Sequence, residues 1–137
     1  MKALLLSPLL ALSLLLSGCA HLDKGADPIV VRAEQSESVA KATFDTFLQI
    51  DNSNRAFFTT NAPPLHAFAE YLRAPVTIPS GGTNLSLPRG LSFVASLDSV
   101  KLAYQHGSAT SNALATAIAV IEVSVSQAQA FIVQQHK

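Results

Sequence analysis

The spacing of apolar residues predicts helices over most of the chain. Between residues 28 and 59 the apolar side chains recur every three or four positions, which places them on one side of a helix. This set is Ile29, Val30, Ala33, Ala40, Phe44, Phe47, Leu48 and Phe58. Asp27 and Pro28 form a helix-start signal, because the carboxylate can accept hydrogen bonds from the first amides and proline fits a first turn. We expect a first helix about 45 Å long. The pattern leaves open whether it is continuous through residues 51–54.

Prolines and glycines divide the middle of the chain. Pro63 and Pro64 end the first helix and begin a short second one, which ends at Ala74 before the next proline. Residues 75–87 carry no charge and are rich in Pro, Gly, Ser, Thr and Asn, so they predict one substantial loop. A brief hairpin across this segment is the alternative.

The last part of the chain predicts two more helices. Pro88 begins the third, which ends at Gly107 because glycine tolerates the left-handed conformation there. Ser108 or Thr110 can cap the fourth. Its main apolar face is formed by Leu114, Ile118, Ile121, Val125, Ala128 and Ile132.

The fourth helix is apolar on more than one side. Between residues 113 and 133 its only charge is Glu122, so neighbouring helices or another subunit should cover it on two flanks. Residues 121–126 alternate like a strand, but the three-to-four spacing extends over more than 20 residues and favours a helix. Glu122 and nearby Ser and Gln residues disfavour a transmembrane span. Short connections predict antiparallel neighbours, so we expect residues 28–137 to form an all-α, elongated up-and-down bundle of three to four helices.

The N-terminus has the layout of a secretory signal. Lys2 supplies a positive charge, and residues 3–16 form an uncharged apolar run. As a helix this run would reach about 21 Å, which is too short for a hydrocarbon core of about 30 Å. Cys19, the only cysteine of the chain, follows directly after Leu16, Ser17 and Gly18.

The four residues Leu16-Ser17-Gly18-Cys19 resemble the lipobox of bacterial lipoproteins. The resemblance implies that residues 1–18 are a cleaved signal peptide, that the Cys19 thiol receives a diacylglycerol and that its new amino group is acylated. Two or three acyl chains make a stable membrane anchor. Residues 19–27 would then be the lipidated cysteine and a short tether, whose residues 20–26 span at most about 25 Å.

The residue after the cysteine bears on localisation. In the lipoproteins of bacteria with two membranes, Asp at that position tends to retain the protein in the inner membrane, so Ala20 favours the outer membrane, facing the periplasm. Two alternatives stay open. Cleavage after Ala20 would release a periplasmic or secreted protein, because Gly18 and Ala20 also satisfy a small-x-small cleavage pattern, and Cys19 could instead lie in an uncut leader.

Composition argues against several function classes. Lys plus Arg equals Asp plus Glu at nine each and charged residues are 13%, so no electrostatic footprint for nucleic acid exists. One cysteine cannot form an internal disulfide, and four scattered histidines make no tetrahedral zinc site. We expect neither a metal nor a cofactor.

Charged residues on the predicted apolar stripes are the candidates for chemistry. Asp51 and Arg55 lie four residues apart in the first helix, and Asp98 lies on the third helix, where it could reach Arg55. A pair of carboxylates can act as acid and base, but a buried polar layer that fixes helix register is the favoured interpretation. A calcium loop at residues 51–54 and a metal site at His66 and Glu70 are both rejected because the further ligands are missing.

These features predict a lipid-anchored cell-envelope protein that acts as a structural or interaction module and is not an enzyme. Its docking face is expected around Val120, Val123 and Phe131 and would bind another envelope protein or further copies of the chain. The alternative is a binding module whose phenylalanine-rich core, between residues 44 and 68, opens to hold an apolar ligand.

Overall fold

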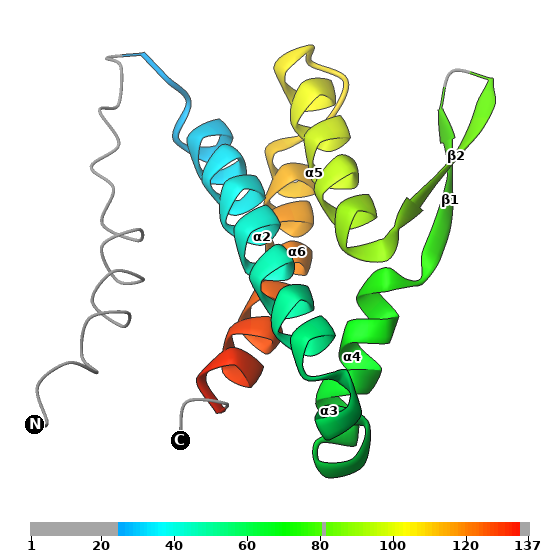
Figure 1. Ribbon diagram of the computed structural model, residues 1–137. Helices are drawn as coiled ribbons and strands as arrows, with labels where there is room; N and C mark the ends of the chain where they lie inside the picture. Colours follow the sequence, from blue (N-terminus) through cyan, green and yellow to red (C-terminus); the bar gives the residue numbers. More distant parts are fainter. Residues whose placement is uncertain (1–24, 81, 135–137) are drawn as a thin grey trace, which may run out of the picture.

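A computed structural model describes residues 25–80 and 82–134. The predicted signal peptide and Cys19 therefore lie outside the described residues. The described part contains five helices and one two-stranded sheet, so the mostly helical prediction is confirmed, but the fold is not a plain bundle of three to four helices (Figure 1). In chain order the elements are α2 (Pro28–Ser53), α3 (Arg55–Asn61), α4 (Pro63–Arg73), β1 (Pro75–Ser80), β2 (Thr83–Pro88), α5 (Arg89–Gln105) and α6 (Ser111–Gln134).

Three long helices form the centre of the molecule. In Figure 1, α6 crosses behind α2, and α5 lies beside both. Each contributes apolar side chains to one core, and a fully buried Val, Leu, Ile or Phe contributes about 1.5–3 kcal/mol relative to an exposed one. The buried apolar side chains of these helices are Ala33, Ala40, Phe44, Phe47, Val94, Leu97, Leu114, Ile118, Ile121, Val125 and Ala128. The predicted inner face of the last helix is confirmed, with Ile132 half-buried at its end.

The first predicted helix is interrupted at Asn54. α2 ends at Ser53, and Asn54 has φ −128° and ψ 25°, outside helical geometry. The Asn54 side-chain amide donates to the carbonyl of Ile50 at 3.0 Å, and its backbone N–H donates to the carbonyl of Asp51 at 3.2 Å. Asparagine favours such local bonds over continued helix. The sequence left open whether the helix continues through residues 51–54, and the structure shows that it does not: α3 begins as a separate helix.

The predicted second helix is confirmed as α4. Its buried residues Leu65, Phe68, Ala69 and Leu72 face the rest of the core. Gly90, at the start of α5, lies beside Phe44 of α2 and Leu72 of α4. A Cβ at this position would lie 3.4 Å from the Phe44 ring and 3.7 Å from the Leu72 side chain, which are ordinary van der Waals distances, so the start of α5 packs against both helices.

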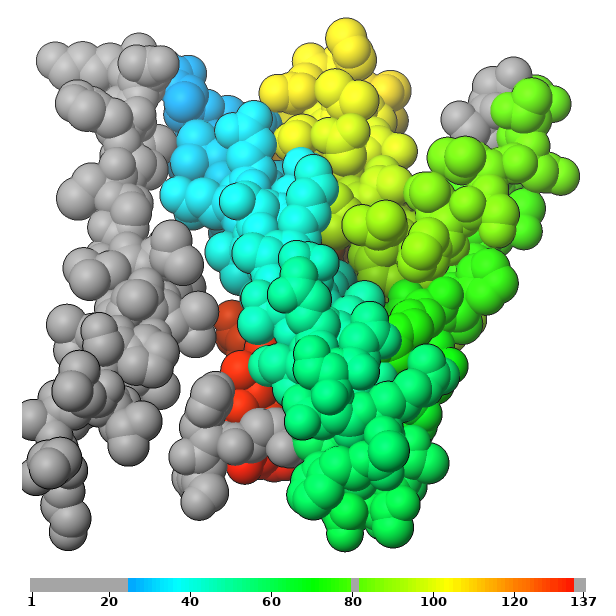
Figure 2. Space-filling model, in the orientation of Figure 1, coloured from blue at the N-terminus to red at the C-terminus, as the bar shows by residue number. Residues whose placement is uncertain are grey.

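The predicted loop at residues 75–87 is a hairpin, which was the alternative interpretation. β1 and β2 pair antiparallel from Pro75 opposite Pro88 to Ser80 opposite Thr83. Gly82 takes φ +85°, the left-handed conformation that such tight turns need. Figures 1 and 2 show the hairpin extending away from the helices, and the Arg89 N–H donates to the Ala74 carbonyl at its base, at 2.9 Å.

The predicted turn between the last two helices is confirmed. Gly107 has φ +74°, and α5 ends just before it. Thr110 caps α6, because its hydroxyl oxygen accepts a hydrogen bond from the Ala113 N–H at 3.2 Å. The predicted start of the first helix is also confirmed, since the Asp27 carboxylate accepts from the Ile29 N–H at 3.1 Å.

Candidate functional site

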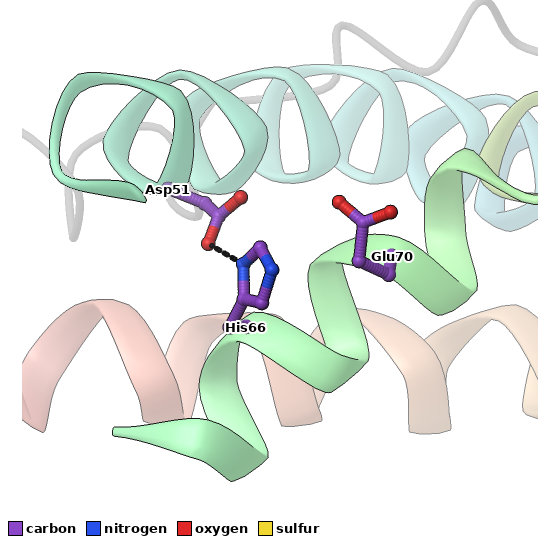
Figure 3. A group of neighbouring side chains, drawn as sticks. All are labelled: Asp51, His66 and Glu70. Carbon is purple, nitrogen blue, oxygen red and sulfur yellow. Dashed lines mark hydrogen bonds and ion pairs between the residues drawn. The ribbon is translucent and has the colours of Figure 1, made fainter. Parts of the chain in front are cut away.

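A buried carboxylate lies where α2 meets α4. Asp51, in the last turn of α2, has no exposed surface. Its Oδ1 lies 2.9 Å from Nδ1 of His66, and its Oδ2 accepts a hydrogen bond from Nη1 of Arg73 at 2.6 Å. Figure 3 shows His66 and Glu70 on one face of α4, turned toward Asp51. Because both carboxylate oxygens have partners, the buried charge is compensated.

Arg73 holds this cluster together. Its Nη1 also donates to Oε1 of Glu70 at 2.9 Å, while its Nη2 donates to the Leu48 carbonyl at 3.2 Å and to the Asn52 side chain at 2.7 Å. Glu70 accepts a further bond from Arg55 at 2.8 Å. One planar guanidinium therefore fastens the end of α4 to the end of α2.

The same residues are the one group among the described residues that could hold a metal ion. Ligand atoms of Asp51, His66 and Glu70 all lie within 4.8 Å of one another. However, Arg73 already bonds one oxygen of each carboxylate, so its guanidinium occupies the place of a cation. Asp51 also has no surface through which a substrate could reach it. The arrangement favours a structural ion-pair network over a metal or acid/base centre.

A second ion-pair cluster connects α2 and α5. Nζ of Lys101 lies 3.0 Å from Oε1 and 3.1 Å from Oε2 of Glu37, and 3.0 Å from Oδ1 of Asp98. Glu37 and Lys101 are both buried. Burial alone would lower the pKa of Lys101, but hydrogen bonds and charge attraction from Asp98 and Glu37 outweigh it, so the pKa of Lys101 is raised. The ammonium group therefore keeps its proton and cannot act as a base at neutral pH.

The predicted polar layer of Asp51, Arg55 and Asp98 is not formed. Asp51 pairs with Arg73 and His66, while Arg55 is exposed and pairs with Glu70. Asp98 instead belongs to the Lys101 cluster. Helical spacing identified Asp51 as buried but could not identify its partners, because Arg73 lies 22 residues away and on another helix.

Two partners in these clusters carried a weak local signal. Arg73 follows Glu70 by three residues, and Lys101 follows Asp98 by three residues, the spacing of ion pairs on one helix face. Glu37 lies 64 residues from Lys101, and nothing in the spacing of the sequence connects them.

A shallow groove of about 480 Å³ runs between α2 and α6. Its polar side is formed by Arg32, whose guanidinium donates to both carboxylate oxygens of Glu122, the shortest bond being 2.8 Å. The hydrogen bonds that Arg32 donates to Glu122, together with the negative charge of Glu122, raise the pKa of Arg32. Because the only strong charges in the groove neutralise each other, it presents no free cation or anion to a ligand.

A second hollow, of about 620 Å³, lies where the start of α2 meets the end of α5. The Tyr104 hydroxyl donates to the Asp27 carboxylate there at 2.7 Å, and this hydrogen bond raises the pKa of Tyr104. The phenol is therefore protonated and already bonded at neutral pH, so it is not poised for chemistry.

The predicted docking face is divided by the structure. Val120 and Val123 are exposed, at 52% and 69%. Phe131 is instead half-buried, and its ring lies 6.0 Å from the Phe47 ring and 5.7 Å from the Phe68 ring. Phe131 therefore belongs to the core, because the crossing of α2 and α6 turns this flank of α6 inward.

The aromatic region proposed as an alternative ligand site is filled by its own side chains. The Phe47 and Phe68 rings lie 5.4 Å apart, and Phe44, Phe47, Phe58 and Phe68 are all buried.

Among the described helices, α6 alone has the length and apolar composition of a membrane span, a test that core helices of soluble proteins also pass. Only 22% of its most apolar 18-residue window is buried.

Comparison of the chain with protein-family models, with curated proteins and with solved structures found no match.

Proposed function

We propose that this protein is a lipid-anchored module of the bacterial cell envelope that works by contact and not by catalysis. The observation that carries the proposal is the contrast between its charged and uncharged surfaces. The charged side chains with special environments, in the Asp51 and Lys101 clusters, are bound to one another, whereas α6 exposes an apolar face that the described residues do not cover. The bound charged groups are not free to react with a substrate. The exposed face of α6, in contrast, is an extended surface that a partner can contact.

The sequence supports the anchoring half of the proposal. The residues Leu16-Ser17-Gly18-Cys19 place the chain's only thiol at the end of a secretory signal. α2 begins at Pro28, nine residues after Cys19, so the tether is short. A fully extended chain of that length spans about 30 Å, which keeps the helical domain and its α6 surface close to the membrane. In a bacterium with two membranes, Ala20 favours the outer one, on its periplasmic side.

Fatty-acid labelling tests the anchor. Cells expressing the full-length chain are grown with a labelled fatty acid, and the wild type is compared with Cys19→Ser. Label on the wild type and none on the variant is the expected result. Absence of label on both proteins, or equal label on both, would remove the lipid anchor from the account.

Activity of the purified chain is the second part of the test. Asp51→Asn and Lys101→Met alter the two charged clusters, and a catalytic site in either would be lost with them. If an assay reveals turnover that one of these variants abolishes, the non-catalytic proposal fails.

A further inference from the structure

One set of exposed residues on α6 has the spacing of a helix–helix seam. We call it the outer seam. Its members are uncharged, all are exposed, and their spacing along the chain is three, four, three, four, three. They are Ala113, Thr116, Val120, Val123, Gln127 and Ala130. This 3.5-residue repeat is the pattern by which one helix packs along another in a coiled coil.

The outer seam is distinct from the face that α6 uses within its own chain. The inner residues, among them Ile118 and Ile121, are buried and follow the same alternating spacing. Every outer residue except Ala113 lies two positions from a buried inner residue, for example Val123 from Ile121, which is about 200° around the helix. α6 therefore has two seams on opposite sides, and only one is covered by α2 and α5. In Figure 1, α6 passes directly behind α2.

The outer seam is complementary to itself when it is reversed. A two-fold axis between residues 121 and 122 would bring Val120 opposite Val123 of a second copy, Thr116 opposite Gln127, and Ala113 opposite Ala130. At the centre two apolar side chains then face each other. In the next layer two polar side chains are paired, and at the ends two small side chains are paired. In heptad terms each pair joins an a position to a d position, the pairing of antiparallel helices. A two-fold interface requires such self-complementarity.

We propose that the outer seam binds the same seam of a second copy of this chain, antiparallel, with the pairing given above. This proposal rests on the proposed function in one respect, because anchoring at Cys19 would concentrate the copies at one membrane surface. Thr116 and Gln127 fix the register, since a slip along the seam would place their polar groups against valine.

Charge supports a second copy over a lipid surface. Helices that lie on membranes carry Lys and Arg on their polar flanks, whereas α6 contains neither. Its only charge, Glu122, is bonded to Arg32 of the same chain. A strongly charged partner would also find no opposite charge on the seam, while an identical uncharged seam matches it.

Disulfide cross-linking tests both the partner and its direction. Two differently tagged full-length chains, one with Thr116→Cys and one with Gln127→Cys, are co-expressed, and the membranes are treated with an oxidant. Antiparallel pairing brings these two positions together, so the mixed product should form. The two copies of position 116 would be eleven residues apart along the axis, about 16 Å, and a disulfide needs Cα atoms about 4.4–6.8 Å apart. Disulfide-linked products of two chains that carry the same tag should therefore be at background.

Two controls define that background. A chain with Ser38→Cys, an exposed position on α2, reports random collision in the membrane, and the unmodified chain reports any product of Cys19 itself. Products within one tag but no mixed product would mean parallel pairing and would overturn the proposal. No product above these controls would also overturn it. In that case, protection of Thr116→Cys from a water-soluble maleimide would indicate that lipid or another protein covers the seam.

Fatty-acid labelling of the same samples separates this proposal from the anchor. If the protein carries the fatty-acid label but no mixed disulfide product forms, the proposed dimer is overturned and the lipid anchor is supported. The mixed product without label supports the dimer and removes the anchor.

Discussion

Asp51 and Arg55 lie four residues apart but differ completely in environment. Asp51 is fully buried with two partners on α4, while the Arg55 side chain is 55% exposed and makes one surface ion pair. Removing one member of a buried ion pair leaves an uncompensated charge, whereas an exposed pair is screened by water. The two residues therefore offer a matched comparison of buried and exposed charge.

We predict that Asp51→Asn lowers the free energy of unfolding by about 3 kcal/mol, because Arg73 loses its shortest contact. Arg55→Gln is the control and should change it by less than about 1 kcal/mol. Urea unfolding followed by circular dichroism measures both. Equal effects of the two substitutions would show that the Asp51 cluster is not a stabilising centre.

The Lys101 cluster predicts a pH dependence. The pKa of Lys101 is raised in the folded protein above its ordinary value near 10.5, so the folded state holds this proton more tightly than the unfolded state. The contribution to stability is then complete below that ordinary value and is lost as the pH rises through the higher, folded value.

We therefore expect the free energy of unfolding of the wild type to fall as the pH is raised above about 10.5. Lys101→Met should be less stable at neutral pH, because Glu37 loses its cation, and should show a smaller fall over the same alkaline range. Tyr104 also has a raised pKa but is present in both proteins, so its effect cancels in the difference. Parallel curves for the two proteins would contradict this assignment.

At the residue scale, the sequence predicted which side chains are buried better than it predicted which residues they contact. The position of Asp51 on an apolar stripe was informative because helical periodicity fixes which side chains share a face. Its partners Arg73 and His66 depend on how α4 folds back against α2, which no local spacing contains.

At the scale of elements, the ends of the helices were predicted best, because a residue next to each end causes the helix to begin or stop there. Asp27, Gly107 and Thr110 perform the capping and turning roles expected of them. Whether the first helix breaks near Asn54 was left open by the sequence, since one asparagine among helix-compatible neighbours is a weak signal against a long apolar stripe.

The β1–β2 hairpin was only an alternative because its strands are six residues each and contain three prolines. Its described side chains are exposed or half-buried, and a two-stranded hairpin is only marginally stable by itself. We predict that its amides exchange with solvent much faster than those of α2, which would be measured by hydrogen exchange and mass spectrometry. Protection equal to that of α2 would contradict an exposed hairpin and indicate a partner that covers it.

For the whole molecule, the expectation of a helical bundle was coarse but correct in kind. The described part departs from a plain bundle in three ways: α3 and α4 fold back at the end of α2, the β1–β2 hairpin separates α4 from α5, and α2 and α6 cross instead of lying alongside each other. The crossing turns the Phe131 flank toward Phe47, although spacing placed Phe131 beside Val120. A helix face that drifts along its length cannot be assigned from periodicity alone when the crossing is unknown.

The proposed dimer depends on α6, which exposes apolar residues on the side opposite to the one that packs in the core. Its exposed valines are the point where a single charge should do most damage, because two copies of Val123 would each face Val120 of the other chain. Val123 is 69% exposed, so a substitution there leaves the core of the single chain unchanged.

The most direct test is the molar mass of the full-length chain, extracted from membranes in mild detergent and measured by light scattering with correction for the detergent. Wild type is compared with Val123→Glu and with Leu102→Glu, a control on α5 that is 46% exposed. Dimerisation through the outer seam predicts a mass of two chains for the wild type and for Leu102→Glu, and of one chain for Val123→Glu. A single-chain mass for the wild type at every concentration, or a two-chain mass that survives Val123→Glu, would contradict it.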